Sequence, residues 1–167
     1  MTMTITATLV LWGLVATIAM TAILEGSQGL GLSRLSLPFL LGSVFSNNRS
    51  TAMVLGITLY VLGGWAFAFL YFLFFASLGV YTWWIGAITG LVHGAFLLVC
   101  AMPVLPYVHP RVASEYNGVS LGRQLEPPGF LAINYGYQTP LTTLLAHSVY
   151  GGVLGACVQL QRSMGGG

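Results

Sequence analysis

The sequence predicts an all-α membrane protein. We expect a bundle of four transmembrane helices, with a short interfacial helix after the first span and a Pro-rich loop between the third and the fourth. Hydrophobic residues make up 56% of the 167 residues and charged residues only 5%, whereas a soluble domain has about 25% charged residues. Four stretches reach the length of about 20 apolar residues that crosses the hydrocarbon core, and none of them contains a charged side chain.

The first predicted span covers residues 5–24. No Lys or Arg precedes it, and no Ala-x-Ala-like cleavage site follows it. A cleavable signal peptide has both features, so we expect a retained helix. Glu25-Gly26 is expected to end this helix.

The connection after the first span contains apolar residues at helical spacing. They are Leu37, Leu40, Leu41, Val44 and Phe45. Ser36 precedes them and suits the N-cap position. This pattern predicts the short interfacial helix.

The second and third predicted spans cover residues 52–77 and 83–102, and Gly79 separates them. Pro103 and Pro106 are expected to end the third span. Trp83 and Trp84 stand where aromatic residues anchor helices at the membrane surface.

The connection before the fourth span is rich in proline and aromatic residues. It is too apolar for a disordered linker and too interrupted for one helix, so we expect it to fold against the membrane surface. The fourth predicted span covers residues 141–160, with Pro140 in its opening turn. The whole chain, 1–167, is read as a single integral membrane domain.

The arginines predict an orientation. Both long connections lie on one side of the membrane, and they carry Arg34, Arg49, Arg111 and Arg123. The opposite side has Arg162. The positive-inside rule therefore places the long connections in the cytoplasm and both termini outside.

Several glycines recur at the spacing of a close-packing helix face. They are Gly86, Gly90 and Gly94 in the third span, Gly151 and Gly155 in the fourth, and Gly56 and Gly64 in the second. Such faces let helix backbones approach each other in lipid, where no hydrophobic drive brings apolar helices together. Threonines in the spans, including Thr17, Thr58 and Thr89, are expected to donate hydrogen bonds between helices.

His93 and His147 stand beside these glycines and therefore face the bundle interior or a partner helix. One interpretation is that each neutral imidazole bonds to a neighbour, such as Tyr60, Tyr150, Ser148 or a carbonyl group, and fixes helix packing. The other is that the two histidines ligate a haem iron, hold a chlorophyll-type pigment or relay protons. The residues leave both interpretations open, and no metal site is predicted.

The few charged residues argue against nucleic acid as a partner and include few side chains that could bind a ligand or catalyse a reaction. Five dispersed arginines with a net charge of +2 do not form the basic patch that binds nucleic acid. Arg111 could bind a lipid headgroup or anchor the helix end. Glu25, Glu115 and Glu126 are expected to form ion pairs with loop arginines.

The segments His147-Ser-Val-Tyr150-Gly151-Gly-Val-Leu-Gly155 and Gly90-Leu-Val-His93-Gly94 carry a resemblance. Here the chain resembles small bacterial membrane proteins of unassigned function that have His-x-x-Tyr-Gly-x-x-x-Gly in a late helix. The resemblance covers the two later spans. It implies a four-helix protein of the bacterial inner membrane and no catalytic residues.

These observations predict a non-catalytic membrane protein, an accessory or structural subunit of a larger bacterial membrane complex that is respiratory or photosynthetic. Its expected partners are the lipid bilayer and other membrane subunits. One alternative is a haem- or pigment-binding protein that uses His93 and His147. A second is a small transporter, channel or lipid-binding protein.

Overall fold

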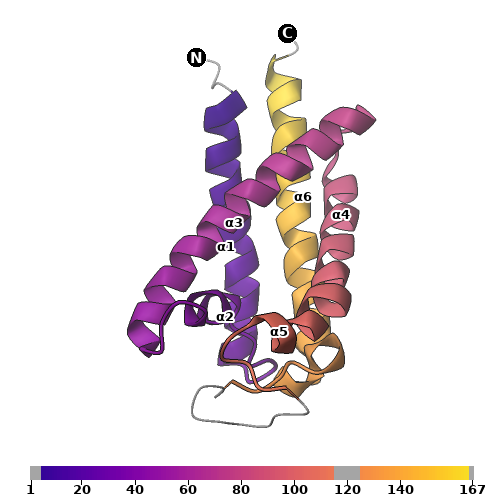
Figure 1. Ribbon diagram of the computed structural model, residues 1–167. Coiled ribbons are helices and arrows are strands. Elements are labelled where there is room, and N and C mark those ends of the chain that lie inside the picture. Colours follow the sequence, from indigo (N-terminus) through magenta and orange to yellow (C-terminus); the bar gives the residue numbers. More distant parts are fainter. Residues whose placement is uncertain (1–4, 115–124, 166–167) are drawn as a thin grey trace. The chain divides into compact units, whose positions relative to one another are not determined.

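The computed structural model describes residues 5–114 and 125–165 (Figure 1). Within these residues the fold is helical, and its one β-type contact is an isolated bridge between Val112 and Leu125. Four helices are long and apolar enough to cross a membrane. They include Leu9–Gly29, Arg49–Leu78, Trp83–Val108 and Thr139–Ser163. The prediction of a multi-pass, all-helical membrane protein is confirmed at this level.

Helix α1 spans Ile5–Gly29, and the prediction that Glu25-Gly26 ends it is wrong. The Leu30 N–H still donates to the Gly26 carbonyl, at 3.0 Å. A glycine inside a helix costs only about 1 kcal/mol and does not stop it. The chain turns instead at Gly31, whose φ of 71° is the left-handed conformation that glycine adopts without strain.

Helix α2 spans Leu37–Ser43, and the Ser36 side chain accepts a hydrogen bond from the Phe39 N–H. Two glycines allow α2 to pack closely against the start of α3. A Cβ atom at Gly42 would overlap the Ala52 carbonyl, and one at Gly56 would overlap the Pro38 carbonyl. The location of α2 at the membrane interface stays a prediction.

Helix α3 spans Arg49–Leu78, three residues longer at its start than predicted. Asn48 caps it, because its Oδ1 accepts the Thr51 N–H at 3.1 Å. Gly79, with a φ of 65°, follows its last residue.

The third span does not end at Pro103, which corrects the predicted boundary. Helix α4 (Trp83–Phe96) continues through a π-helical turn, η1 (Leu97–Ala101), into α5 (Met102–Val108). Pro103 has no N–H, and its ring clashes with the carbonyl four residues earlier in an α-helix. The wider π turn accommodates this proline, so the helical path continues to Val108.

The last elements are the turn η2 (Phe130–Tyr135) and helix α6 (Thr139–Gly165). Leu131 and Ala132 in η2 have left-handed φ angles of 54° and 59°, and each such non-glycine residue costs about 1–2 kcal/mol. Pro140 is the second residue of α6, as predicted for an opening turn.

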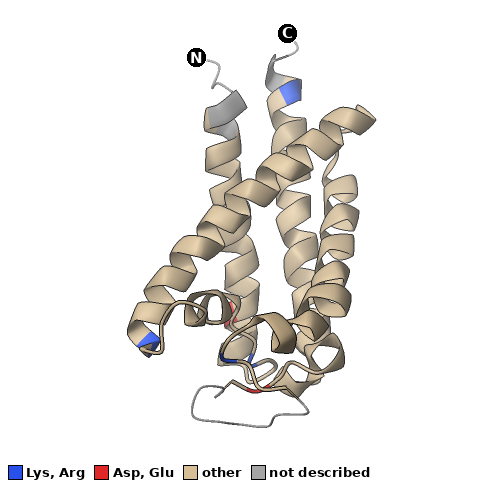
Figure 2. Cartoon of the chain, viewed as in Figure 1, with Lys and Arg blue, Asp and Glu red and all other residues tan. Residues whose placement is uncertain are grey.

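The chain forms two compact units. The first contains Met1–Ile23, Val61–Gly94 and Leu144–Gly167, and the second contains Leu24–Tyr60 and Ala95–Thr143. Both long connections therefore belong to the second unit. In Figure 2 the helices are tan along their lengths, and the described charged residues lie near helix ends and in connections.

Candidate functional site: a histidine–tyrosine cluster beside a glycine interface

The glycines of α4 and α6 meet each other inside the first unit. A Cβ atom added at Gly86 would overlap the Gly151 carbonyl, and one at Gly90 would overlap the His147 carbonyl. Likewise, a Cβ at Gly155 would overlap the carbonyl of Thr82. The two helices therefore run backbone to backbone over this stretch.

The same interface brings His93 and His147 together. Their ring centroids are 5.0 Å apart, and the rings are nearly perpendicular at 79°. His147 is 3% exposed. The position that a Gly94 Cβ would take lies 3.1 Å from the His147 Cβ, so Gly94 makes room for this side chain.

Tyr71 of α3 completes the cluster. Its hydroxyl lies 3.2 Å from Nδ1 of His93, and its ring packs edge-on against Tyr150 at 5.5 Å. Tyr71 was missed at the sequence level, although one signal was present. Phe67, Tyr71 and Phe75 recur every four residues on α3, which is the spacing of a single helix face.

Tyr150 joins α6 to α3 through a buried hydrogen bond. Its hydroxyl donates to the Gly64 carbonyl at 2.6 Å. Gly64 also faces α1, because a Cβ there would collide with the Thr17 side chain. Ser148 donates to the Ala87 carbonyl at 3.1 Å, so it bonds to helix α4 rather than to a histidine.

A haem held between His93 and His147 is one of the two interpretations that the sequence left open for this cluster. Axial histidines bind the iron from opposite faces of a flat macrocycle. The rings of His93 and His147 are in direct contact, so a macrocycle does not fit between them in this arrangement. Within the described residues, no group of three His, Cys, Asp or Glu side chains gathers as a metal site.

Thr17, Thr58 and Thr89 bond within their own helices, which corrects the interhelical bonds expected for them. Thr17 donates to the Gly13 carbonyl at 2.7 Å, and Thr58 and Thr89 likewise donate four residues back. In a helix, the carbonyl four residues earlier can accept a hydrogen bond from a threonine hydroxyl. These three hydroxyl groups therefore have their hydrogen-bond acceptors within their own helices.

The predicted anchoring residues lie outside the cluster. Trp83 and Trp84 are exposed at the start of α4. Arg111, in the second unit, donates through Nε to Oδ1 of Asn47.

The second unit contains a buried histidine, His109, for which the sequence predicted no interior position. Nε2 of His109 lies 2.9 Å from the Leu40 carbonyl oxygen, and its Nδ1 accepts the Arg111 N–H at 3.1 Å. A nitrogen that accepts an N–H carries no proton, so the proton is on Nε2. His109 thus ties α2 to the residues after α5. No local sequence signal points to this tertiary role.

A solvent-exposed ion pair also joins two segments of the second unit. Arg34 lies 3.0 Å from the Glu126 carboxylate, which is the expected kind of pairing between a glutamate and a loop arginine; Glu115 and Arg123 lie outside the described residues. The Tyr135 hydroxyl donates to the Glu126 carbonyl at 2.7 Å. Burial, and secondarily the Glu126 charge, raise the pKa of Tyr135 to about 12, while Arg34 opposes the shift.

The fold and the site together define a multi-pass helical membrane protein with a closely packed polar cluster between its helices. No protein-family model matches the sequence, and no significant match is found among curated proteins or solved structures.

Proposed function

We propose that the chain is a non-catalytic accessory subunit that binds another protein of a bacterial membrane complex through its long connections. The observation that carries this proposal is an exposed apolar patch outside the spanning helices. We define the loop patch as Leu30, Leu32, Ile133 and Tyr137. Tyr137 is 92% exposed and Leu30 is 77% exposed.

The loop patch comes from two segments that are bonded to each other in the second unit. The Arg34 N–H donates to the Tyr135 carbonyl at 2.6 Å, and Ser33 and Thr139 share a buried hydroxyl contact of 2.8 Å. These bonds hold the patch in a defined arrangement. Full burial of a large apolar side chain yields about 1.5–3 kcal/mol, so covering the patch would contribute substantially to binding.

The loop patch is a better candidate for the partner-binding surface than the glycine faces of the spanning helices. Gly86, Gly90, Gly151 and Gly155 make close backbone contacts inside the chain, so these four residues are not available to pack against a partner. The histidine–tyrosine cluster uses its polar groups in packing and hydrogen bonding between helices. This arrangement supports a structural role for the polar residues inside the spans.

The proposal includes an orientation. The long connections would face the cytoplasm of a bacterial inner membrane, because four of the five arginines belong to them. The protein partner would then meet the loop patch from the cytoplasmic side.

Site-specific photo-crosslinking tests the proposal. A photoreactive amino acid replaces Tyr137 in the native host, and cross-linked products are identified by mass spectrometry. Phe69, which is exposed on α3, provides the matched lipid-facing control. We expect one protein to be captured from position 137 and lipid from position 69. Capture of lipid alone at both positions would overturn the proposal.

A further inference from the structure

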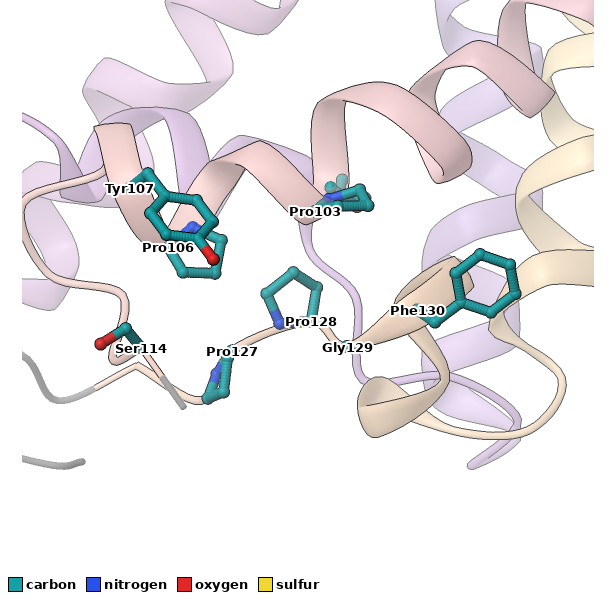
Figure 3. Close-up of a pocket in the computed structure, with 9 residues that line it drawn as sticks. Pro103, Pro106, Tyr107, Ser114, Pro127, Pro128, Gly129 and Phe130 are labelled. Atoms are coloured by element: carbon teal, nitrogen blue, oxygen red, sulfur yellow. The ribbon is translucent and has the colours of Figure 1, made fainter. Parts of the chain in front are cut away.

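The second unit has a cavity of about 210 Å³ between α5 and the segment before η2. Figure 3 shows its lining, with Tyr107 and Ser114 at one end, Pro103 and Phe130 at the other, and Pro128 between them. The remaining lining residues are Met102, Pro106, Pro127 and Gly129.

The lining selects for an uncharged ligand. Its side chains are apolar apart from the hydroxyl groups of Tyr107 and Ser114. Among the residues that the structure describes, no cation lines the cavity to pair with a buried phosphate or carboxylate, and burial of an unpaired charge is costly. Four prolines and two aromatic rings instead offer flat apolar surfaces, which suit a planar ring.

The volume restricts the ligand further. A cavity of about 150 Å³ binds benzene, and pockets for drug-sized ligands begin at about 300 Å³. The 210 Å³ of this cavity therefore fits one substituted ring and excludes a whole lipid. Any hydrocarbon tail must extend out of the cavity.

The position of the cavity indicates where the ligand comes from. Helix α5 supplies Met102, Pro103, Pro106 and Tyr107, which are the last residues of the candidate span Trp83–Val108. The cavity therefore lies at one end of a predicted span, where hydrocarbon meets water. Tyr107 and Phe130 beside it are 74% and 67% exposed, as expected for aromatic residues at this level.

The wall opposite α5 is held in place before any ligand binds. The Asn134 side chain donates to the Pro127 carbonyl at 3.0 Å, and the Asn134 N–H donates to the Pro128 carbonyl at 3.1 Å. Gly129 adopts a left-handed φ of 71° that lets the chain turn over Asn134. A fixed wall lowers the entropy cost of binding.

We propose that this cavity binds the headgroup of a membrane-dissolved quinone, a single uncharged ring that carries carbonyl oxygens on a hydrocarbon tail. The ring lies among the prolines and Phe130, and the Tyr107 hydroxyl donates to a ring carbonyl. The tail leaves the cavity toward the bilayer. This ligand site is independent of the proposed accessory role.

Photolabelling of the purified full-length protein tests the site, with an azido derivative of a short-chain benzoquinone as the probe. We expect saturable labelling of residues 97–114 or 125–135 that an unlabelled short-chain benzoquinone prevents. Phe130→Ala and Tyr107→Ala should each weaken binding by about fivefold or more, equivalent to about 1 kcal/mol. Both residues are exposed, so neither change removes a core contact.

Phe45→Ala is the matched control, because it removes an exposed aromatic side chain of the second unit that does not line the cavity. Its binding should equal that of the wild type. Circular dichroism should show equal helix content for all three variants. Absence of saturable labelling, an equal loss of binding in Phe45→Ala, or equal competition by a ring-free alkyl chain would each overturn the quinone site.

Discussion

Close packing of α4 against α6 requires glycine at single positions. Two adjacent glycines on α6, Gly151 and Gly152, allow the effect of a substitution on packing to be distinguished from its effect on helix propensity. Gly151→Ala places a methyl group against the Gly86 backbone, whereas a Cβ at Gly152 meets only ordinary contacts, the nearest at 3.6 Å. We expect Gly151→Ala to cost about 1–3 kcal/mol, as overpacking does, and Gly152→Ala to be tolerated. Reversible unfolding in mixed micelles measures both. Equal stability of the two variants would contradict this packing.

Tyr135 gives the second unit a pH dependence. Its pKa is raised to about 12 in the fold, against about 10 in the unfolded chain. The unfolded chain therefore loses the phenol proton first. The contribution of Tyr135 to stability is complete below pH of about 10 and declines as the pH rises through about 12.

Tyr135→Phe should remove this alkaline loss of stability and also cost about 1 kcal/mol at neutral pH, because the hydrogen bond to Glu126 disappears. Unfolding of both proteins across the alkaline range, followed by circular dichroism, provides the measurement. Tyr137→Phe, which changes a fully solvated phenol, serves as control. Identical pH profiles for Tyr135→Phe and wild type would show that another group is responsible.

For single residues, the sequence identified interior histidines but did not identify the side chains that they contact. The spacing of His93 and His147 relative to the glycines predicted that both face the interior, and the structure places them in contact. Their neighbour Tyr71 and the buried role of His109 depend on which helices meet. That information is tertiary and is not contained in a local pattern.

For single elements, glycine and proline predicted helix boundaries correctly only where the backbone adopts a conformation that these residues favour. Gly79 has a positive φ and does separate two helices, whereas Gly26 is helical and separates nothing. Pro103 does not end the helix, because the preceding π turn leaves room for the proline ring. Four apolar stretches were nevertheless enough to predict four long helices, since length and hydrophobicity are local properties.

The turn before η2 provides a test at this scale. Gly129→Ala forces an L-residue into a left-handed φ of 71° and brings its Cβ to 2.8 Å from the Asn134 side chain. We expect a loss of about 1–3 kcal/mol in stability, together with loss of quinone binding. Gly26→Ala, in a helical position with open space around it, is the control and should be neutral or slightly stabilising. Unaltered unfolding of Gly129→Ala would argue against this turn.

At the scale of the whole molecule, the distribution of arginines predicts the topology. A periplasmic reporter enzyme fused after residue 167 should be active, and the same reporter inserted after residue 46, between α2 and α3, should be inactive. Arg34→Gln with Arg49→Gln should weaken this preference, because the positive-inside rule counts these charges. An active reporter at residue 46 would reverse the proposed orientation.

A chain that works as a subunit should leave the membrane together with the protein that it binds. Native mass spectrometry of complexes released by a mild detergent from the source membrane tests this most directly. We expect the chain in a fixed ratio with one larger membrane protein, and we expect that partner to be lost when Tyr137 and Leu30 are replaced by Ser. Recovery of the wild-type chain alone, or only with lipid, under conditions that preserve known complexes of the same membrane would contradict it.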